Sequence, residues 1–411
     1  MSAPASIAIV GASLAGLRAA ETLRRSGFDG SLTLIGDEPH APYDRPPLSK
    51  QFLSGEWDHT RLALIAPEKL AELHLDLRLG TRATGLDVGE RAVTTSPTTI
   101  EASSAGDERV VADGILIATG ARARTLPYAE RPGLHVLRSR DDAELLHQAL
   151  ASGPRHVVVV GAGFIGAEVA ATARQMGATV SMVELAEAPM IRGLGIDLGL
   201  FCAEVHRERG VDVRLGVGVD QILGDAAVTG VVLTDGSEIT ADIVVVGVGA
   251  VPNTEWLEGS GLALDNGVVC DDTCLAAPGI VAAGDVARWH NRLFDEVMRV
   301  EHWDNAVEQG MYAARRLLAQ EAPEPFTPVP WFWSDQFDHK IQLAGRRADG
   351  DQTLTVTGSR EDRKFASIFG RDGRIMAVFG FNRPRHVMKF RRLIAAGGSW
   401  DQARELADEM G

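Results

Sequence analysis

The stretch HVVVVGAGFIGAEVAATARQMGATVSMVE, residues 156–184, contains a strand, a glycine loop, a helix and a second strand in that order. An apolar run leads into Gly161, Gly163 and Gly166, and an alanine-rich helical stretch follows. In such a unit the first glycine makes a tight turn, the second lets a pyrophosphate approach the backbone, and the third lets the helix pack on the strand. The helix N-terminus then offers N–H groups and a positive dipole end to the phosphates. The stretch therefore predicts a dinucleotide-binding unit.

An acidic residue closes this unit and predicts which dinucleotide it binds. Glu184 lies 23 residues after Gly161, at the end of the second strand. A carboxylate there accepts hydrogen bonds from both hydroxyls of an adenosine ribose and repels a 2′-phosphate, so the prediction is NAD(H) and not NADP(H). The 44 glycines of the chain would produce such spacings by accident, so the flanking strands, helix and acid carry the argument.

The same unit also occurs nearer the N-terminus, as IAIVGASLAGLRAAETLRRSGFDGSLTLIGDE, residues 7–38. In chain order residues 7–38 are therefore the first copy and residues 156–184 are the second. Gly11 begins its loop, and Ser13 replaces the middle glycine. Serine is small, so a close backbone approach is retained, although the motif alone is less specific. The acid at the end of its second strand is Asp37 or Glu38. The duplication predicts two nucleotide sites in one chain.

Composition excludes several classes of protein. The net charge of −15 over 411 residues argues against a general nucleic-acid binder. Residues 331–411 carry 14 basic and 11 acidic side chains, so this portion is where an acidic partner would bind. Neither a membrane span nor a signal peptide is predicted, because no apolar run is long enough and the first apolar segment lacks a basic flank. Three cysteines are too few for a disulfide framework, and reduced thiols in a cytoplasmic protein are expected.

Two buried strands that end at glycines, GILIATG (114–120) and DIVVVGVG (242–249), bracket the second copy symmetrically. This arrangement predicts an α/β fold in which one Rossmann-like domain is inserted into another. The predicted boundaries are residues 1–119 and 246–325 for the first nucleotide-binding domain, 120–245 for the NAD(H)-binding domain, and 326–411 for a small C-terminal α+β interface domain.

Other elements follow from local patterns. Residues 76–116 alternate short apolar runs with turn residues, which predicts a small antiparallel meander. The run GIVAAGDVA (279–287) returns the chain to the first domain, and a helix is expected from Trp303 to Gln320. In the C-terminal domain, strands are expected near 341–345, 353–357, 365–370 and 374–381, followed by a basic helix.

Seven motifs, in order along the chain, together resemble those of the FAD-dependent pyridine nucleotide oxidoreductases. They are GASLAG (11–16), PYDRPPLSK (42–50), ATG (118–120), GAGFIGAE (161–168), AAGDVA (282–287), HWDNAVEQG (302–310) and WFWSDQ (331–336). Within that family the chain resembles the NADH-dependent ferredoxin reductases of oxygenase systems, of the putidaredoxin reductase and biphenyl dioxygenase ferredoxin reductase type. The resemblance implies a glutathione-reductase-like fold.

The resemblance also implies that the first copy binds FAD and the second binds NADH. The implied FAD-binding residues are Gly11, Ser13, Leu14, Ala15, Gly16, Asp37, Glu38, Arg45, Lys50, Ala118, Thr119, Gly120, Arg122, Gly284, Asp285, Trp303 and Trp333. The implied NAD-binding residues are Gly161, Gly163, Phe164, Ile165, Gly166, Glu168, Glu184, Arg192 and Gly249. No metal site is predicted.

Several of these residues also have an ordinary structural reading. Arg45 and Lys50 could be surface cations, and Glu168 could simply complement a helix dipole. Asp285 could accept a hydrogen bond from a ribityl hydroxyl or cap the next helix, and the two roles are compatible. The resemblance implies more for Lys50 and Glu168: both would lie beside the flavin and nicotinamide and form a pair.

The C-terminal domain offers candidates for the surface that meets an electron acceptor. Trp331 and Trp333 are core residues or, by the resemblance, one of them lies near the flavin edge. The run NRPRHVMKFRRL (382–393) is a solvated face or a patch that steers an acidic iron–sulfur protein. Its five positive side chains and no acid are the candidate partner-binding residues: Arg383, Arg385, Lys389, Arg391 and Arg392.

Cysteine placement narrows the chemistry. Disulfide reductases and NADH peroxidases of this superfamily carry cysteines in the segment after the first motif, whereas this chain has none before Cys202. Electrons would therefore pass from flavin directly to an external acceptor. The resemblance implies hydride transfer from NADH to FAD, then single-electron transfer to a transiently bound [2Fe–2S] ferredoxin that supplies a cytochrome P450 or a Rieske oxygenase. The alternatives are a rubredoxin or quinone reductase of the same fold and an NADH-sensing flavoprotein of the apoptosis-inducing-factor type.

Overall fold

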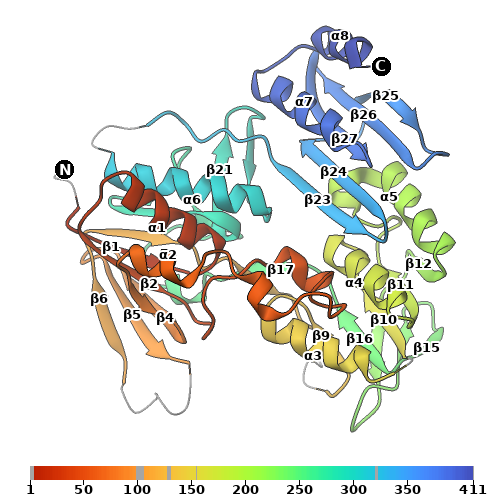
Figure 1. Cartoon of the computed structure of the whole chain (residues 1–411), viewed down its shortest axis with the longest axis horizontal. Coiled ribbons are helices and arrows are strands. Elements are labelled where there is room, and N and C mark those ends of the chain that lie inside the picture. Colours follow the sequence, from red (N-terminus) through yellow and green to blue (C-terminus); the bar gives the residue numbers. More distant parts are fainter. Residues whose placement is uncertain (1–3, 99–105, 127–130, 154, 320–322, 411) are drawn as a thin grey trace. The chain divides into compact units, whose positions relative to one another are not determined.

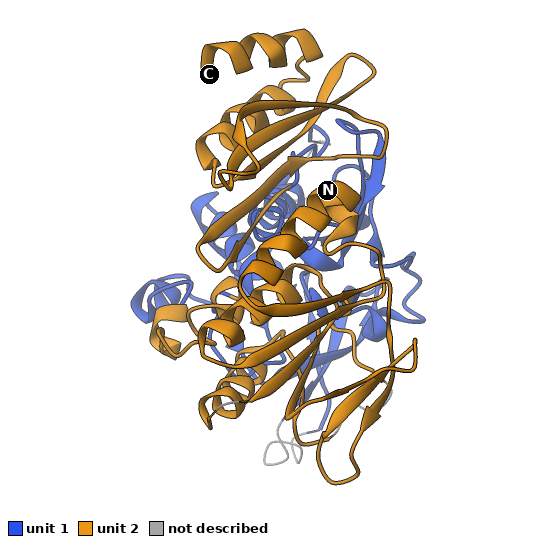
Figure 2. Ribbon diagram, turned by 90° about the vertical axis from the view of Figure 1, so that its right-hand side faces the viewer, with its two compact units in different colours: residues 1–44, 63–122, 251–330 blue, residues 45–62, 123–250, 331–411 orange. Residues whose placement is uncertain are grey.

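Each glycine loop lies at the centre of its own parallel sheet. A computed structural model describes residues 4–98, 106–126, 131–153, 155–319 and 323–410 (Figure 1). The chain divides into two compact units (Figure 2). Unit 1 comprises residues 1–44, 63–122 and 251–330, and unit 2 comprises residues 45–62, 123–250 and 331–411.

Unit 1 is built around the N-terminal copy. Its six-stranded sheet has the order β19-β20-β7-β1-β2-β3, and all its pairs are parallel except β19–β20. The strands are β1 (Ser6–Val10), β2 (Ser31–Ile35), β3 (Asp76–Arg78), β7 (Gly114–Ile117), β19 (Leu275–Ala277) and β20 (Ile280–Ala282). Helix α1 (Leu14–Arg25) packs on α6 (Trp303–Leu318), where a Cβ at Gly310 would lie 2.4 Å from the Ala15 carbonyl oxygen. The helix predicted from Trp303 is thereby confirmed.

Unit 2 repeats this plan around the second copy. Its five-stranded sheet has the order β12-β11-β10-β16-β9 with every pair parallel. Strand β10 takes the place that β1 has in unit 1, and β16 takes the place of β7. The elements are β9 (Leu134–Val136), α3 (Arg140–Ala151), β10 (His156–Val160), α4 (Phe164–Gln175), β11 (Thr179–Glu184), α5 (Ile191–Glu208), β12 (Val211–Leu215) and β16 (Ile243–Val246).

Each parallel sheet is accompanied by a three-stranded antiparallel sheet. In unit 1 it consists of β4 (Thr81–Asp87), β5 (Ala92–Pro97) and β6 (Glu108–Val111), and in unit 2 of β13 (Val219–Leu223), β14 (Gly230–Leu233) and β15 (Glu238–Thr240). The meander predicted for residues 76–116 is thus confirmed at its centre and wrong at its ends. Residues 76–78 and 114–117 pair in parallel with β2 and β1. Strand β7 is buried along its whole length, as a strand of a covered parallel sheet must be.

The C-terminal residues form a five-stranded antiparallel sheet of order β23-β24-β27-β26-β25. Its elements are β23 (Trp331–Gln336), β24 (His339–Gly345), β25 (Gln352–Ser359), β26 (Lys364–Arg371), β27 (Arg374–Phe381), α7 (Pro384–Ala395) and α8 (Trp400–Met410). The four predicted strands and the basic helix are confirmed, but β23 and α8 were not predicted. Strand β23 lacks the alternation of apolar and polar residues that predicts a strand, because two of its buried residues, Ser334 and Gln336, are polar.

Short elements complete the two units. They are η1 (Pro46–Ser49), η2 (His59–Leu62), α2 (Pro67–Glu72), β8 (Ala121–Ala123), β17 (Ala250–Pro252), η4 (Glu255–Leu257), β18 (Val268–Val269), η5 (Gly284–Val286), β21 (Ala287–Asn291) and β22 (Glu296–Met298). The compact units group residues 45–62 and 331–411 with the second copy, so the three-domain boundaries stay a prediction. Within the described ranges, no helix is long and apolar enough to cross a membrane.

Candidate functional site

The glycine loop of unit 2 leaves room for a phosphate at its middle position. Gly161 has φ +95°, and a Cβ there would lie 2.5 Å from the carbonyl oxygen of Gly247. A Cβ at Gly166 would lie 2.0 Å from the carbonyl oxygen of Gly161, so helix α4 packs directly on the turn. At Gly163 a Cβ would meet nothing closer than the Gly247 oxygen, at 4.0 Å. The open middle position fits the close approach of a pyrophosphate.

The N-terminal loop has the same geometry, which explains why it accepts a serine. A Cβ at Gly11, whose φ is +122°, would lie 2.0 Å from the Ala118 carbonyl oxygen. A Cβ at Gly16 would lie 2.0 Å from the carbonyl oxygen of Gly11. Ser13 has φ −113°, which any residue adopts without strain. Serine thus stands at the loop position whose backbone does not demand glycine.

Both loops lead into helix N-termini that suit an anion. Neither α1 nor α4 has an acidic residue in its first turn. Ser13 makes no side-chain capping hydrogen bond to any described residue. The first turns, which contain the predicted contacts Leu14, Ala15, Phe164 and Ile165, therefore present backbone N–H groups and the positive end of the helix dipole. The two loops fit the pyrophosphates of two dinucleotides.

Replacing Gly166 by Ala should strongly destabilise the protein, whereas replacing Gly163 by Ala should not. The methyl group at position 166 would overlap the Gly161 carbonyl oxygen, and overpacking against backbone costs about 3 kcal/mol. Gly163 has φ −70° and open space around a Cβ, so the same methyl group fits. Thermal unfolding of the two variants measures the difference. Equal melting temperatures would contradict this packing argument.

The acid predicted to bind the adenosine ribose is held by the backbone. Glu184 Oε2 accepts the N–H of Ala162 in the glycine loop at 2.7 Å, and Oε1 accepts the N–H of Ala186 at 2.9 Å. Each carboxylate oxygen has a further acceptor position, so ribose hydroxyls can still bind. Of the other NAD predictions, Gly249 has φ +113° with open space around a Cβ, and Arg192 is exposed in the first turn of α5.

In unit 1 the two candidate acids differ in their surroundings. Asp37 is exposed, whereas Glu38 accepts a short hydrogen bond, 2.5 Å, from the hydroxyl of Tyr43. The predicted FAD-binding residue Trp303 begins α6, and its indole Nε1 donates to Asp44 at 2.8 Å. The Glu38 carboxylate and the Trp303 indole are thus held by polar contacts inside unit 1.

Five further predicted FAD residues, 118–120, Gly284 and Asp285, lie at the carboxyl ends of β7 and β20, two neighbouring parallel strands. Residues 118–120 follow β7, and Thr119 exchanges two hydrogen bonds with Asn253. Gly284 and Asp285 begin η5, and the Gly284 N–H donates to the side chain of Gln309 at 2.9 Å. Ligands of open α/β sheets bind at this edge, so the placement suits a nucleotide cofactor.

Arg122, another predicted FAD residue, is occupied by protein partners in unit 1. Its guanidinium donates to the side chain of Asn253 at 3.2 Å and pairs with Glu255 at 2.5 Å. Both partners lie beyond residue 250, so Arg122 connects the end of the second chain segment of unit 1 (63–122) to the start of the third (251–330). The contact gives Arg122 a structural role whatever else it binds.

The predicted Lys50–Glu168 pair is formed within unit 2 and is buried. Lys50 Nζ lies 2.6 Å from Glu168 Oε2, and the two side chains are 12% and 7% exposed. Ser49 donates to the same Oε2 at 2.6 Å, and Lys50 also donates to Ser49 Oγ and to the carbonyl oxygen of Pro46. Ser334 donates to Glu168 Oε1 at 2.7 Å. Both carboxylate oxygens are therefore fixed by charge-assisted hydrogen bonds.

Other predicted residues of unit 2 lie on the 45–50 loop and on β23. Arg45 donates to the carbonyl oxygen of Arg138 at 2.7 Å, which holds the start of η1. Trp331 and Trp333 stack with ring centroids 5.2 Å apart, and Arg391 of α7 lies over the Trp331 ring at 5.7 Å. These contacts join the aromatic strand to the basic helix.

Sequence reasoning missed four polar residues of the Glu168 cluster. They are Ser49, His206, Ser334 and Gln336. Three of them lie inside motifs quoted above, but no role was predicted for them. A serine or glutamine in a sequence motif gives no indication that its side chain is buried. His206 carried no signal at all.

The cationic run forms the helix α7, which is amphipathic. Val387, Phe390 and Ile394 are buried against the sheet, and Arg385 and Arg392 are exposed. Burial, with help from the positive charges of neighbouring residues, holds the pKa of His386 below its usual value. These neighbours are Arg383, Arg385 and Lys389. Among the described residues none of the three has an ion-pair partner, so the patch keeps its positive potential.

The thiols are inert. All three cysteines are buried and unpaired. Burial raises the pKa of Cys202 and of Cys270 to about 12, and it raises the pKa of Cys274 as well. Because the thiolate is the reactive form, none of them offers a redox thiol.

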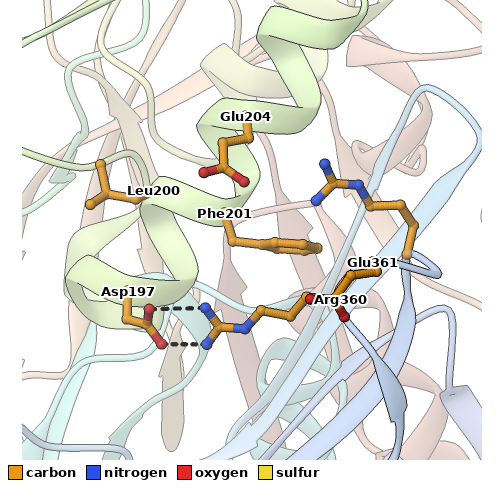
Figure 3. A pocket seen from close by; sticks show the side chains of 7 residues that line it. Asp197, Leu200, Phe201, Glu204, Arg360 and Glu361 are labelled. Carbon is orange, nitrogen blue, oxygen red and sulfur yellow. Dashed lines mark hydrogen bonds and ion pairs between the residues drawn. The ribbon is translucent and has the colours of Figure 1, made fainter.

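An open pocket of about 380 Å³ lies between α5 and the turn that joins β25 to β26 (Figure 3). Asp197 and Arg360 face each other across it and form a bidentate ion pair. Hydrogen bonding to Arg360 lowers the pKa of Asp197. Within the described ranges, none of the predicted site residues lines this pocket. Its ion pair joins α5 to the C-terminal sheet.

Comparison with known proteins identifies the family. The pyridine nucleotide-disulphide oxidoreductase family matches residues 5–310, and the reductase C-terminal family matches residues 331–410. Together the two matches cover both glycine loops and the C-terminal sheet.

Individual relatives match over almost their full length. Rhodocoxin reductase of Rhodococcus erythropolis is 39% identical over 95% of this chain and 89% of its own. The ferredoxin reductase component of chlorobenzene dioxygenase from Cupriavidus sp. is 36% identical over 98% and 95%. The covalent putidaredoxin reductase–putidaredoxin complex contains a similar fold, with a TM-score of 0.89 and 32% identity over 96% of this chain and 94% of that one. The chain belongs to the pyridine nucleotide-disulphide oxidoreductase family.

Proposed function

We propose that this protein oxidises NADH and delivers the electrons, by way of FAD, to a [2Fe–2S] ferredoxin that supplies an oxygenase. The observation that carries the proposal is the match along both units, C-terminal sheet included, to reductases named for rhodocoxin, putidaredoxin and dioxygenase ferredoxins. FAD is required because nicotinamide gives electrons in pairs and an iron–sulfur centre takes them singly. The inert thiols support direct transfer to an external acceptor.

In this reaction the residues of the chain bind and orient the two nucleotides. Hydride transfer needs no acid, base or nucleophile from the protein. In this proposal the loop at Gly11 holds the FAD pyrophosphate and the loop at Gly161 holds that of NADH. Glu184 binds the adenosine ribose. The Lys50–Glu168 pair, formed within unit 2, would contact the nicotinamide end of NADH and help to orient it for hydride transfer.

Helix α7 is the proposed docking surface for an acidic ferredoxin. Its exposed arginines lie on a chain of net charge −15, and a local cationic patch steers an acidic partner to one face. Such an interface is transient and sensitive to ionic strength. Cytoplasmic location, predicted from the cysteine usage, stays a prediction.

Stopped-flow reduction tests the proposed function. The bound flavin should be reduced faster by NADH than by NADPH, and the reduced protein should be reoxidised by a [2Fe–2S] ferredoxin. Turnover with an artificial one-electron acceptor but not with ferredoxins would favour a rubredoxin or quinone reductase. A long-lived reduced flavin–NAD complex without ferredoxin reduction would favour an NADH sensor.

Charge reversal on α7 should slow ferredoxin reduction. Replacing Arg385 and Arg392 by Glu should lower the second-order rate constant with an acidic ferredoxin by about tenfold at low salt, since rim charges mainly set association rates. The rate of flavin reduction by NADH should not change. The matched control is Arg404→Glu on α8, an exposed arginine outside the cationic run. Equal slowing by the control variant would contradict a docking role for α7.

A further inference from the structure

A buried chain of hydrogen bonds runs from the Glu168 carboxylate into the core of unit 2. Ser334 bonds to Glu168, Gln336 Nε2 lies 3.0 Å from Ser334 Oγ, and Gln336 Oε1 lies 2.9 Å from His206 Nε2. Ser334, Gln336 and His206 are at most 1% exposed. The chain joins α4, β23 and α5, which are brought together from distant parts of the sequence. Buried polar groups of this kind are costly unless each is satisfied by its neighbour.

The direction of every hydrogen bond in this chain is fixed. A carboxylate only accepts, so the Ser334 hydroxyl donates its proton to Glu168 Oε1. Ser334 Oγ then accepts from the Gln336 amide group, which turns Oε1 of Gln336 towards His206. That oxygen also only accepts, so His206 carries its proton on Nε2. Starting from the carboxylate, the orientation of each group determines the orientation of the following one.

The chemistry of these groups suits the positioning of Glu168. Burial lowers the pKa of His206 to about 4, so that its ring is neutral around pH 7. Its Nδ1 has no hydrogen-bond partner among the described residues, so the chain ends there. The hydrogen-bond chain therefore ends at His206 and presents one hydrogen bond of fixed direction to Glu168.

We propose that Ser334, Gln336 and His206 form a positioning chain that orients the Glu168 carboxylate and, through it, the Lys50 ammonium. Ser334 holds Oε1, while Ser49 and Lys50 share Oε2, so removal of Ser334 frees the carboxylate to rotate. This inference rests on the proposed function, because it deepens the role of the Lys50–Glu168 pair in hydride transfer.

The hydrogen-bond chain includes residues of the C-terminal sheet. That sheet would therefore take part in the step in which NADH reduces the flavin. Side chains alternate along β23, so Trp331 and Trp333 face one way, and Ser334 and Gln336 face the other. The strand that presents the tryptophans therefore holds the Glu168 carboxylate from its opposite face. Hydride transfer would depend on β23, a strand that belongs to neither of the sheets that carry the glycine loops.

Ser334→Ala tests the positioning chain, with Ser367→Ala as its matched control. Ser367 is a buried serine on β26 of the same sheet, and its hydroxyl bonds to Thr355 instead of Glu168. In the FAD-loaded protein, Ser334→Ala should lower the rate constant of flavin reduction by saturating NADH by about tenfold, as small misplacements of positioning groups do. Reoxidation by ferredoxin should keep its rate, and Ser334→Thr, which retains the hydroxyl, should recover most of the loss.

A second readout does not depend on turnover. Competitive acetylation followed by mass spectrometry reports how readily the Lys50 amine leaves its buried pair. Labelling of Lys50 should rise about fivefold in Ser334→Ala and in Gln336→Leu, because local opening becomes easier, and should stay unchanged in Ser367→Ala. Gln336→Leu keeps the Ser334 hydroxyl, so it tests the chain even where Ser334→Ala folds poorly.

The outcomes separate this inference from the proposed function. A wild-type protein that NADH does not reduce would remove the proposed function, and the positioning role with it. A wild-type protein that is reduced normally, with Ser334→Ala matching Ser367→Ala in both reduction rate and Lys50 labelling, would overturn the positioning chain alone. Equal slowing of reduction and reoxidation in Ser334→Ala would also overturn it, since a general packing defect acts on both steps.

Discussion

Replacing Glu168 by Gln will lower the rate constant of flavin reduction by NADH about a hundredfold. The substitution keeps the shape of the side chain and removes the charge that pairs with Lys50, whose side chain is only 12% exposed. Without its partner charge the Lys50 ammonium is no longer held in place, and a misplacement of about 1 Å at a reacting site can cost about 100-fold in rate. Single-turnover stopped-flow at the flavin band measures the rate. Glu204→Gln, an exposed acid on α5, is the control and should keep the wild-type rate.

The pairing itself is tested by exchanging the two charges. Lys50→Glu and Glu168→Lys should each slow reduction, because each places two like charges at a contact that is 2.6 Å long in the native protein. The double exchange restores opposite charges and should recover at least tenfold of the loss in either single variant. Losses that simply add would show that the two residues act independently.

Replacing Glu184 by Gln together with Leu185 by Arg will reduce the preference for NADH over NADPH about a hundredfold. The Glu184 carboxylate is held by the Ala162 and Ala186 N–H groups, so its charge stands at a fixed place where a 2′-phosphate would bind. Glutamine retains an acceptor oxygen for the loop and removes the repulsion. Leu185 is 72% exposed, so an arginine there can reach an added phosphate. The ratio of kcat/KM values for the two cofactors, with ferricyanide as acceptor, measures the change.

The control for cofactor choice lies in the other glycine unit. Asp37→Asn removes an exposed acid near the end of β2 and should leave the NADH-to-NADPH ratio unchanged. A Glu184→Gln/Leu185→Arg variant with unaltered selectivity would remove Glu184 from the site.

The glycine loops could be predicted from sequence because their requirement is local. Gly161 and Gly11 adopt positive φ, and a Cβ at Gly166 or Gly16 would overlap a backbone oxygen. Glycine is therefore strongly favoured at these four positions. The alternating order of strand, helix and strand then specified two parallel sheets. The Lys50–Glu168 contact was predicted by resemblance, and the structure contains it.

The support around that contact could not be predicted, because it depends on register between distant elements. Ser334 reaches Glu168 only because β23 packs on α4 in one alignment, and nothing in WFWSDQ states which face turns inward. His206 stands in the charged run HRERG, which is typical of an exposed helix end, yet it is fully buried. Buried polar residues that satisfy one another leave no periodic apolar signal.

The interleaving of the two units has a consequence for the order in which the nascent chain folds. Strand β7 pairs with β1 on one side and with β20 on the other, but residues 280–282 are synthesised after every strand of the unit 2 parallel sheet. That second sheet, from β9 to β16, is contiguous and can form first. Until β20 emerges from the ribosome, β7 remains an open sheet edge, the kind of surface on which folding intermediates aggregate. The nascent chain is therefore more open to edge-to-edge association before residues 280–282 have been synthesised than afterwards.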